Sequence, residues 1–169
     1  RPPGRGAAGG GARQDPVSAA PAPVRVVAPA PEHRAAWERL YAGYAAFYRV
    51  EQTPEMRERV WGWITDPASE VECLLAVDAS GAPVGLAHFR EFARPLFAAR
   101  GGYLDDLFVA PEARGSGAAR ALIEALAAEG RRRGWSLVRW ITADDNYRAR
   151  GLYDRLARRT HWLTYDLTP

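Results

Sequence analysis

Residues 105–120, with the sequence DDLFVAPEARGSGAAR, combine residue types suited to binding a phosphorylated ligand. The run Leu107–Val109 is typical of a strand, Pro111 ends it, and apolar residues recur at helical spacing after Gly117. Gly115 and Gly117 therefore precede the first turn of a helix, where backbone N–H groups lack partners and the helix dipole is positive. Because glycine lets a bulky anion approach those donors closely, we predict that this loop binds a diphosphate.

Several phosphate-binding motifs contain a glycine loop, and the flanking residues decide between them. A Walker loop requires lysine, which this chain lacks altogether, and the Rossmann motif requires a third glycine, which is missing here. The loop instead resembles the Arg/Gln-x-x-Gly-x-Gly/Ala motif of the GNAT superfamily of N-acetyltransferases, with Arg114, Gly117 and Ala119 at the three defined positions. The preceding apolar strand and Pro111 fit that family too. The resemblance implies that the bound diphosphate belongs to acetyl-CoA.

A second group of residues lies on a helix expected after Asp144 and Asp145, whose side chains favour turns and helix N-caps. Tyr153 follows Asn146 by seven residues, so two helical turns bring the two side chains to one face. On the residues alone, Tyr153 is either a core aromatic or a functional side chain. The Asn146-x-x-Ala149-x-x-x-Tyr153 spacing resembles the second GNAT motif, which implies that Tyr153 lies beside the CoA sulfur and protonates the departing thiolate.

Acetyl transfer to an amine requires a base, because an ammonium of pKa about 10 must first lose a proton. Side chains alternate along the predicted strand Tyr103–Val109, so Asp105 shares a face with Leu107 while Asp106 points the other way. Asp105 corresponds to the acidic position that relatives use near the amine, which implies a general base. The alternative is an ion-paired strand carboxylate. The resemblance also implies that a backbone N–H near Leu107 or Phe108 binds the oxyanion.

The resemblance assigns two sets of binding residues besides the catalytic pair Tyr153 and Asp105. The residues expected to contact acetyl-CoA are Leu107, Phe108, Val109, Arg114, Gly115, Ser116, Gly117, Ala118, Ala119, Arg120, Asn146 and Ala149. The residues expected to contact the amine acceptor are Tyr44, Tyr48, His88 and Asp105. For the tyrosines and the histidine the alternatives are an aromatic core stripe and a structural side chain. The scattered histidines and the single Cys73, which lies in an apolar run, offer no metal-ligand spacing, so no metal is expected.

Hydrophobic periodicity and turn signals predict a single domain of residues 24–169, after a Pro/Gly/Ala/Arg-rich segment 1–23 that is expected to be disordered. Helices are predicted at Glu32 to about Val50, Pro54 to Thr65, from Ser116 onward and around Asn146–Tyr153. Strands are predicted at Val24–Val27, Val71–Val77, Pro83–Glu91, Tyr103–Val109, Ser136–Ile141 and near Trp162–Leu167, with a hairpin turn at Asp78–Gly81. This order, strand–helix–helix–strand–strand–strand–helix–strand–helix–strand, is that of the GNAT fold. The resemblance implies an α/β (α+β) domain whose mixed, mostly antiparallel sheet is flanked by helices.

Composition limits the remaining function classes. The net charge of +3 comes from arginines that are dispersed except for Arg131–Arg133, whose position before Gly134 favours a helix C-terminus over a phosphate or nucleic-acid patch. No apolar run approaches the roughly 18 residues of a membrane span. A single cysteine is typical of proteins in a reducing cytosol. We therefore expect a cytoplasmic protein that binds neither nucleic acid nor membrane, with a homodimer left open.

Together, the residues and the resemblance predict an acetyl-CoA-dependent N-acetyltransferase. The expected reaction is direct transfer of an acetyl group to a primary amine of a small molecule, either a polyamine or an amino-acid-like compound. The chain most resembles the subgroup of fungal histone and D-amino-acid acetyltransferases and, more distantly, the spermidine/spermine enzymes. The alternatives are acetylation of protein lysines or N-termini, a non-catalytic acyl-CoA-binding module, and a basic nucleic-acid-binding protein.

Charge and bulk at the expected mouth of the cleft suggest the acceptor. The carboxylates of residues 105–106 and 144–145 would attract a cationic amine. An arginine, Arg90 or Arg94, could instead hold the carboxylate of an amino acid. The bulky Trp162 is expected to narrow the acceptor end, which favours a small amine over a protein lysine.

Overall fold

A computed structural model describes residues 24–169 of the chain, so the expected disorder of residues 1–23 lies outside the described residues. The principal elements are β1 (Arg25–Val27), α1 (Arg34–Tyr48), α2 (Pro54–Thr65), β2 (Val71–Val77), β3 (Pro83–Arg94), β4 (Ala99–Val109), α3 (Ala118–Arg133), β5 (Val138–Arg139) and α4 (Tyr147–Leu156). Short 3-10 turns stand at Pro31–His33, Pro95–Phe97 and Pro111–Ala113, each with proline at its first position, where the missing N–H costs no hydrogen bond.

The strands form one sheet in the order β1-β2-β3-β4-β5, antiparallel from β1 to β4 and parallel between β4 and β5. This confirms the mixed, mostly antiparallel sheet. The turn between β2 and β3 is organised by Asp78, whose carboxylate accepts hydrogen bonds from the backbone N–H groups of Ser80 and Ala82. Gly81 has a φ of 88° there, a conformation that other residues rarely adopt.

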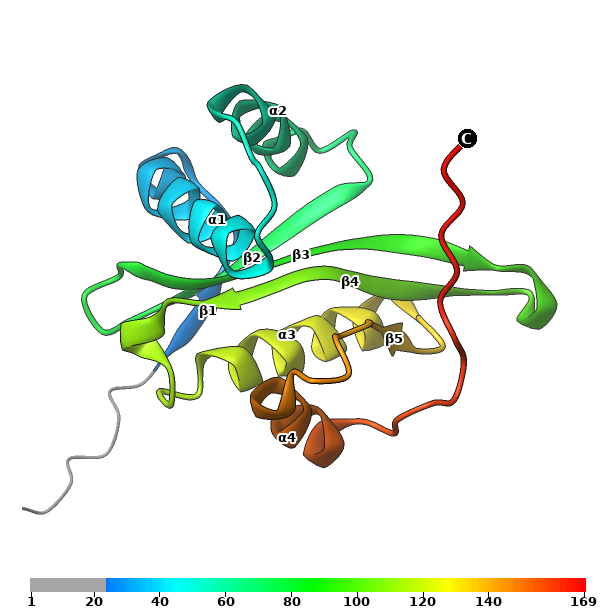
Figure 1. Cartoon of the computed structure of the whole chain (residues 1–169). Helices are drawn as coiled ribbons and strands as arrows, with labels where there is room; N and C mark the ends of the chain where they lie inside the picture. Colours follow the sequence, from blue (N-terminus) through cyan, green and yellow to red (C-terminus); the bar gives the residue numbers. More distant parts are fainter. Residues whose placement is uncertain (1–23) are drawn as a thin grey trace, which may run out of the picture.

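Helices cover both faces of the sheet, with α1 and α2 on one face and α3 and α4 on the other (Figure 1). One core cluster packs α1 against the first face around the fully buried Trp37, Leu75 and Leu86. The other packs α3 against the opposite face around Leu122 and Leu126. Side chains of successive strand residues therefore alternate between two buried layers, as expected for a sheet covered on both sides.

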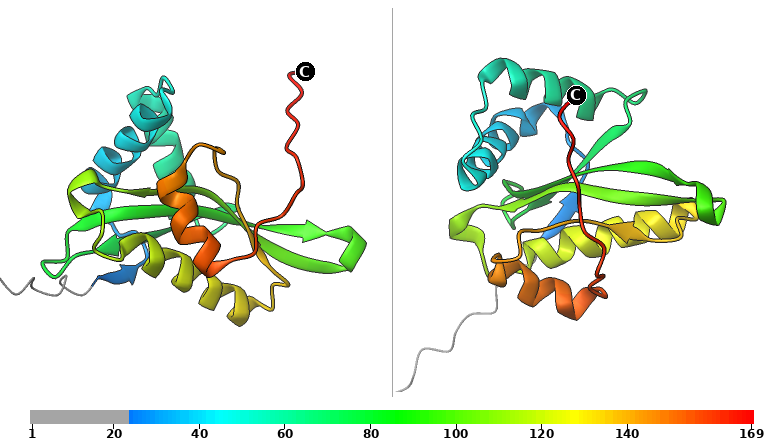
Figure 2. Two further views of the ribbon diagram at one scale, coloured as in Figure 1. Left: turned by 60° about the horizontal axis from the view of Figure 1, so that its bottom comes forward. Right: turned by 45° about the vertical axis from the view of Figure 1, so that its right-hand side comes forward.

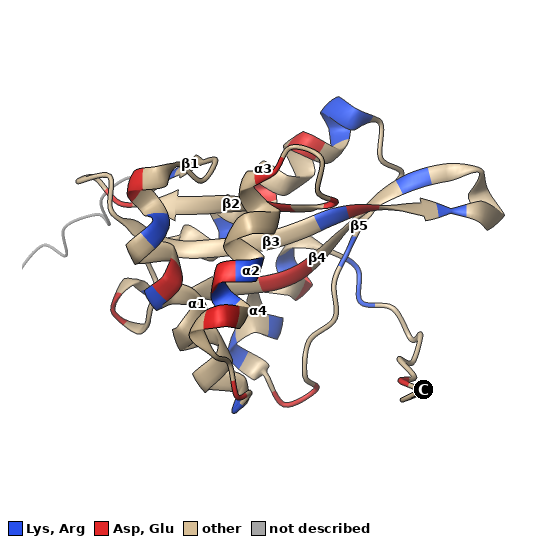
Figure 3. Cartoon of the chain, turned by 90° about the horizontal axis from the view of Figure 1, so that it is seen from above, with Lys and Arg blue, Asp and Glu red and all other residues tan. Residues whose placement is uncertain are grey.

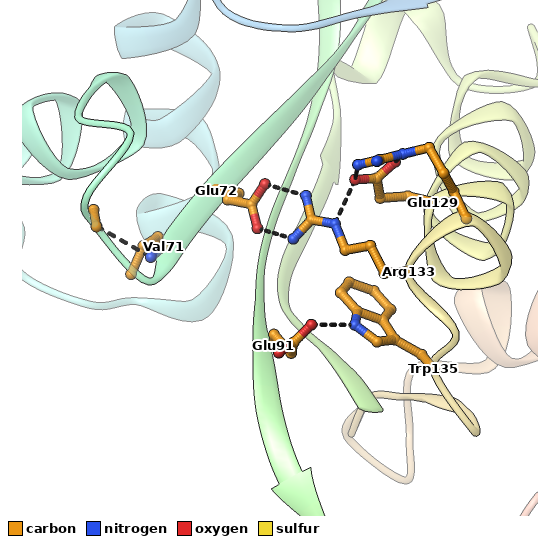
Figure 4. A network of polar contacts seen from close by, with 8 residues as sticks. Val71, Glu72, Glu91, Glu129, Arg133 and Trp135 are labelled. Atoms are coloured by element: carbon orange, nitrogen blue, oxygen red, sulfur yellow. Dashed lines mark hydrogen bonds and ion pairs between the residues drawn. The ribbon is translucent and has the colours of Figure 1, made fainter. Parts of the chain in front are cut away.

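The C-terminal end of α3 is fixed to the sheet by a polar network (Figure 4). Arg133 binds Glu72 of β2 through two hydrogen bonds of 2.6 Å and also pairs with Glu129 one turn earlier. Hydrogen bonding to the neighbouring arginines lowers the pKa of Glu129 to about 2. Trp135 donates its Nε1 hydrogen to Glu91 at 2.6 Å. This network holds the far end of the helix whose N-terminal end carries the glycine loop.

The arginine triplet 131–133 ends α3, as the sequence predicts. Gly134 follows as the C-cap with a φ of 71°, and its N–H bonds the carbonyl of Arg131. Elsewhere basic and acidic residues are interspersed over the helices and strands rather than separated (Figure 3). Within residues 24–169 no helix combines the length and apolarity needed to cross a membrane.

The structure corrects three boundaries. β3 and β4 extend to Arg94 and back to Ala99, and β4 passes close to Trp135 at its glycines. A Cβ at Gly102 would lie 2.2 Å from that indole ring. β5 is only two residues long, since the chain turns away from β4 after Arg139.

The predicted last strand near Trp162–Leu167 is wrong for the isolated chain. Residues 158–169 have no helix or strand assignment, and every residue after Leu156 is exposed. The segment leaves α4 as an irregular coil whose end lies clear of the sheet in Figure 1, and it passes in front of the domain in the right-hand view of Figure 2. A strand needs a neighbour to satisfy its backbone N–H and C=O groups, and this segment has none among residues 24–169.

Candidate functional site

The candidate site is a cleft of about 220 Å³ between the C-terminal ends of β4 and α1 and the helix α4. β4 is free of β5 beyond Tyr103, because only Gly102 and Tyr103 of β4 pair with β5. The residues that line the cleft are Tyr44, Phe47, Tyr48, Leu107, Phe108, Val109, Arg114, Ala119, Asn146, Arg148, Ala149, Leu152 and Tyr153. Side chains that the sequence places more than 100 residues apart therefore face one cavity.

The glycine loop lies at one end of this cleft and offers backbone donors. Gly115 and Gly117 have φ values of 91° and 89°, which side chains with a Cβ rarely adopt. A Cβ at either position would meet no protein atom within 4 Å, so protein packing does not require glycine there. Among the described residues, the loop N–H groups without an intramolecular acceptor are those of Gly115, Gly117, Ala119 and Arg120. These donors and the dipole of α3 suit an anion.

Two guanidinium groups at the cleft add positive charge to these donors. Arg114 and Arg148 both line the cleft, and neither forms an ion pair within residues 24–169. Arg120, the third basic residue of this region, pairs instead with Glu124 one helical turn further along. Two arginines without internal carboxylate partners are well suited to bind phosphate groups.

The helix α4 places Tyr153 on the opposite wall. Asn146 is its N-cap, and the Asn146 carboxamide oxygen accepts a hydrogen bond from the N–H of Ala149 at 3.4 Å. Tyr153 packs edge-to-face on Trp140, with ring centroids 5.3 Å apart. Burial raises the pKa of Tyr153 to about 12, and the nearby Tyr48 adds to the shift. The phenol therefore keeps its proton at physiological pH and is available as a donor.

A β-bulge in β4 changes the orientation of the two aspartates. The pairing with β3 runs His88 to Asp106 and then Phe89 to Leu104, which leaves Asp105 as the extra residue. Leu104 and Leu107 face the α3 layer, whereas the side chain of Asp106 bonds His88 on the α1 face. The expectation that Asp105 and Asp106 point to opposite faces is therefore wrong. An extra residue shifts the alternation, so both carboxylates lie on the α1 side.

Asp105 is held at this bulge by Arg90. Arg90 donates its Nε hydrogen to the Asp105 carboxylate, with an N···O distance of 3.3 Å, and its guanidinium stacks over the ring of Tyr103. Partial burial raises the pKa of Asp105 above its usual range, although the Arg90 charge opposes that shift. A raised carboxylate pKa in a half-exposed position is typical of proton-transfer groups, but an ion-paired strand carboxylate would have the same partner.

Asp106 ends a buried chain of hydrogen bonds. Trp37 of α1 donates its Nε1 hydrogen to His88 Nε2 at 2.9 Å, so the other imidazole nitrogen, Nδ1, carries the proton. That Nδ1–H donates to the Asp106 carboxylate, also at 2.9 Å. His88 is 2% exposed and both of its ring nitrogens are occupied. The expectation that His88 contacts the acceptor is corrected: His88 lies beneath the site and orients Asp106.

Tyrosines of α1 connect Asp106 to the cleft. Tyr41 meets the His88 ring edge-on at 4.8 Å, and burial together with the Asp106 charge raises the pKa of Tyr41 to about 12. Burial and Asp106 also raise the pKa of Tyr44 strongly, and Tyr44 contacts Tyr48 edge-to-face at 5.0 Å. Tyr44 and Tyr48 line the cleft, whereas Asp105 and Asp106 are absent from its lining, and Asp106 lies behind it in contact with Tyr44.

Some lining residues were missed by the sequence reasoning. The lining also includes three helix residues beside motif positions, Phe47, Arg148 and Leu152. The only sequence signal for these three residues is their spacing relative to Tyr48 and Tyr153. Cys73 is buried, and burial raises the pKa of its thiol, in keeping with a packing role. Among the described residues no group of three His, Cys, Asp or Glu side chains could hold a metal ion.

Comparisons with known proteins agree with this geometry. The model of the acetyltransferase (GNAT) family matches residues 37–157. The chain is 29% identical over 136 residues to the D-amino-acid N-acetyltransferase HPA3 of Saccharomyces cerevisiae, a match that covers 80% of this chain and 84% of that protein. Its structure resembles a ribosomal-protein-alanine N-acetyltransferase of Brucella melitensis biovar Abortus 2308, with 25% identity, a TM-score of 0.74 and coverage of 86% and 99% of the two chains.

A further structural neighbour contains CoA. The aminoglycoside N-acetyltransferase AAC(6')-Iy in complex with CoA superposes with a TM-score of 0.73, over 86% of this chain and 94% of that one. At 17% identity this likeness shows the shared fold alone. The five-stranded sheet and the helices on its two faces are thus those of an established acetyltransferase architecture.

Proposed function

The chain belongs to the acetyltransferase (GNAT) family, and from this premise we propose that it transfers an acetyl group directly from acetyl-CoA to a primary amine of a small molecule. The family membership makes it an acetyl-CoA-dependent N-acetyltransferase. The observation that carries the finer proposal is the cleft itself, which lies between the glycine loop and the tyrosines Tyr44, Tyr48 and Tyr153, with Asp106 in contact with Tyr44. The cytoplasmic location stays a prediction from the cysteine content.

The residues at the glycine loop fit acetyl-CoA, whose thioester supplies the acetyl group. The N–H groups of Gly115, Gly117 and Ala119 would bind the diphosphate, and the two guanidiniums without ion-pair partners, Arg114 and Arg148, would neutralise its charge. We expect the residues Leu107–Val109 to line the pantetheine path, because they form the β4 wall of the cleft. A backbone N–H near Leu107 or Phe108 would stabilise the charge that develops on the thioester oxygen.

Tyr153 and Asp105 would manage the two protons of the reaction. Tyr153 faces the cleft as a protonated phenol and would donate a hydrogen bond and its proton to the leaving thiolate. Asp105 would accept the proton of the ammonium, directly or through one water. Asp106, fixed by His88, lies on the same face of the sheet and would add negative charge beside the incoming amine. No covalent acyl-enzyme is required, since the one cysteine is buried.

The cationic, small-molecule acceptor is supported by charge and aromatic rings. Tyr44 and Tyr48 line the cleft, and an ammonium can bind over such rings next to carboxylates. The curated relative is named for D-amino acids, which makes an amino-acid-like amine the first compound to test. Of the two arginines considered as carboxylate clamps, Arg90 pairs with Asp105 and Arg94 bonds Ser136. Trp162 does not narrow this cleft in the single chain, because it is 78% exposed and absent from the lining.

A panel of amines tests the proposed acceptor. CoA release would be measured with D- and L-amino acids, spermidine, an aminoglycoside and a lysine-containing peptide, each over a range of concentrations. We expect the highest kcat/KM with a small amine. A clear preference for the peptide would overturn the small-molecule proposal and favour protein acetylation. Tight acetyl-CoA binding without turnover on any amine would instead favour a non-catalytic acyl-CoA-binding module.

Replacement of Asp105 by asparagine should lower kcat/KM about 10²-fold near neutral pH, the lower range for loss of a general base. The amine must then lose its proton to solvent, so the pH at which kcat/KM reaches its plateau should rise toward the pKa of the free amine. Burial raises the pKa of Asp105 in the folded protein, so the ionised carboxylate disfavours folding above its unfolded pKa. The variant should therefore remain folded at neutral pH.

The control for this prediction is Asp154→Asn, which removes an exposed carboxylate of α4. It should leave the pH profile unchanged. A profile of the Asp105→Asn variant that coincides with the parent would leave Asp105 as the ion-pair partner of Arg90 only. The same measurement on Asp106→Asn would then show whether the carboxylate fixed by His88 is the base.

A further inference from the structure

Tyr44 lies between the cleft and a largely buried carboxylate. Its side chain lines the cleft, and its hydroxyl is a hydrogen-bond partner of Asp106. Asp106 is absent from the lining, and its side chain is 22% exposed. The tyrosine therefore stands between a ligand in the cleft and the negative charge behind it.

The hydrogen bonds at Asp106 determine what the Tyr44 hydroxyl can offer to a ligand. A carboxylate accepts hydrogen bonds and donates none, so its partners must provide the hydrogens. His88 provides its Nδ1–H at 2.9 Å, and Tyr41 and Tyr44 provide their hydroxyl hydrogens. Burial and the Asp106 charge raise the pKa of both phenols, so both stay protonated at physiological pH. Because a phenol has a single O–H, the Tyr44 oxygen keeps only acceptor capacity toward the cleft.

The tautomer of His88 decides whether this arrangement holds. The indole N–H of Trp37 can only donate, so His88 Nε2 accepts from it at 2.9 Å and the proton lies on Nδ1. Trp37 is 0% exposed and His88 is 2% exposed, so water does not compete for these bonds. With the opposite tautomer a bare Nδ1 would face the carboxylate, and Asp106 would turn toward other donors. Trp37 therefore fixes, through His88, the direction in which Asp106 receives its hydrogen bonds.

We propose that the Tyr44 oxygen accepts a hydrogen bond from the ammonium of the acceptor substrate, and that Trp37 and His88 are positioning residues that give Tyr44 this polarity through Asp106. This role of Tyr44 rests on the proposed amine acceptor and adds how the cleft holds its ammonium. An alkylammonium fits, because it has N–H donors, no acceptor and a positive charge. A carboxylate or phosphate would find no donor on Tyr44 and a negative charge behind it. The ammonium end of the substrate therefore lies toward Tyr44.

A hydrogen bond and a stack of aromatic rings hold a cation in different ways. The faces of aromatic rings bind quaternary ammonium ions as well as primary ones. The Tyr44 oxygen requires an N–H, which a trimethylated nitrogen lacks. A primary ammonium should therefore bind more tightly than its trimethylated analogue, and this preference should depend on the Tyr44 hydroxyl and on the His88 donor.

The experiment measures the binding of n-butylammonium and n-butyltrimethylammonium to the full chain saturated with CoA, by NMR of the ¹⁵N-labelled protein. We expect the parent to bind the primary ion about tenfold more tightly, which corresponds to one charge-assisted hydrogen bond. Tyr44→Phe should bind both ions equally, because the ring stays and the oxygen is lost. The matched control Tyr48→Phe removes a hydroxyl one turn further along α1 in the same cleft and should keep the parental ratio of affinities.

Replacement of His88 separates positioning from packing. The His88→Leu variant lacks the donor to Asp106 and should lose the preference for the primary ion. His88→Asn can place an amide N–H near the position of Nδ1 and should restore the preference. Trp37→Phe should act like His88→Leu, because His88 is then free to take either tautomer. An unchanged preference in His88→Leu would make His88 and Trp37 core residues only and overturn their positioning role.

Two measurements on the parent test the same chain where a core variant fails to fold. The ¹⁵N signals of His88 should show a protonated Nδ1 and a bare Nε2. The indole N–H signal of the buried Trp37 should shift when n-butylammonium binds, since the ligand acts on it through Tyr44 and Asp106. The opposite tautomer or an indole signal that does not move would overturn the positioning role.

The role of Tyr44 and the proposed function fail in different ways. Equal binding of the two ions by the parent, or no binding of either, would overturn the role of Tyr44. Turnover of small amines would then still support acetyl transfer. A Tyr44-dependent preference for the primary ion in a protein that acetylates no amine would support the ammonium site and contradict the proposed acetyl transfer.

Discussion

Replacement of Tyr153 by phenylalanine is expected to lower kcat about 10²-fold, the lower range for loss of a positioned proton donor. Phenylalanine keeps the edge-to-face packing on Trp140, so the shape of the cleft and the affinity for acetyl-CoA should change little. The substitution is expected to lower kcat rather than substrate affinity, because the phenol interacts with negative charge on the sulfur only as the carbon–sulfur bond breaks. Pre-steady-state release of CoA at saturating amine would measure this step.

The pH dependence of this loss follows from the environment of Tyr153. Burial raises its pKa to about 12, so the phenol is protonated in the whole range of about pH 6 to 9. Deprotonation of Tyr153 should therefore not lower the kcat of the parent enzyme in that range. The plot of kcat against pH for the variant should have the same shape at lower values. A phenol of pKa about 12 is a weaker acid than an ordinary thiol of about 8.5, so its hydrogen bond to the developing thiolate should provide most of the effect.

Tyr147→Phe is the matched control for this variant. Tyr147 stands on the same helix, is 75% exposed and is absent from the cleft lining. Its replacement should leave kcat unchanged. If Tyr153→Phe also turned over at the parent rate at every pH, Tyr153 would be a packing residue of α4, and the departing thiolate would take its proton from solvent.

The parts of the site that could be predicted from sequence are those built by local interactions. The positive φ values of Gly115 and Gly117, the N-cap at Asn146 and the position of Tyr153 each depend on residues within two helical turns. Motif spacing carries such information because turn and cap chemistry is local. The hairpin turn at Asp78–Gly81 was predictable for the same reason.

The orientation of the aspartates could not be predicted in this way. A bulge arises from the register of two strands. The sequence of β4 alone does not determine which residue of β3 lies opposite each of its residues. The unfavourable pair Asp105-Asp106 in a strand was the one local signal of an irregularity. Likewise, the contact of Trp37 with His88 joins residues 51 positions apart, so sequence reasoning left open whether that histidine was structural.

The C-terminal segment shows a different limit. Its alternating pattern predicts a strand, and the structure shows that no intrachain edge receives it. Periodicity predicts which side chains of a strand are buried, but it does not predict whether a neighbouring strand is present to pair with it. Trp162 is therefore exposed in the single chain, although its bulk and position predict that it narrows the acceptor end of the cleft.

Replacement of Gly117 by valine should have the largest effect on the cofactor, with a loss of acetyl-CoA affinity of about 100-fold or more. A valine side chain would project from the first turn of α3 into space where no protein atom lies within 4 Å, which is the space assigned to the diphosphate. It would also strain a residue whose φ is 89°, at a cost of about 1–3 kcal/mol. Losing access to the loop N–H donors removes several charge-assisted hydrogen bonds, each worth about 1.5–3 kcal/mol.

Gly81→Val separates the strain from the blocked approach. Gly81 has nearly the same backbone conformation, with a φ of 88°, and a Cβ there also meets nothing within 4 Å, but it lies in the turn between β2 and β3. Both variants should therefore lose similar unfolding free energy in urea, while calorimetry should show weakened acetyl-CoA binding for Gly117→Val alone. Equal affinity in the two variants would mean that the diphosphate binds away from this loop. A folded Gly117→Val variant with parental affinity would lead to the same conclusion, because a branched side chain at that position leaves no room for a diphosphate on the loop N–H groups.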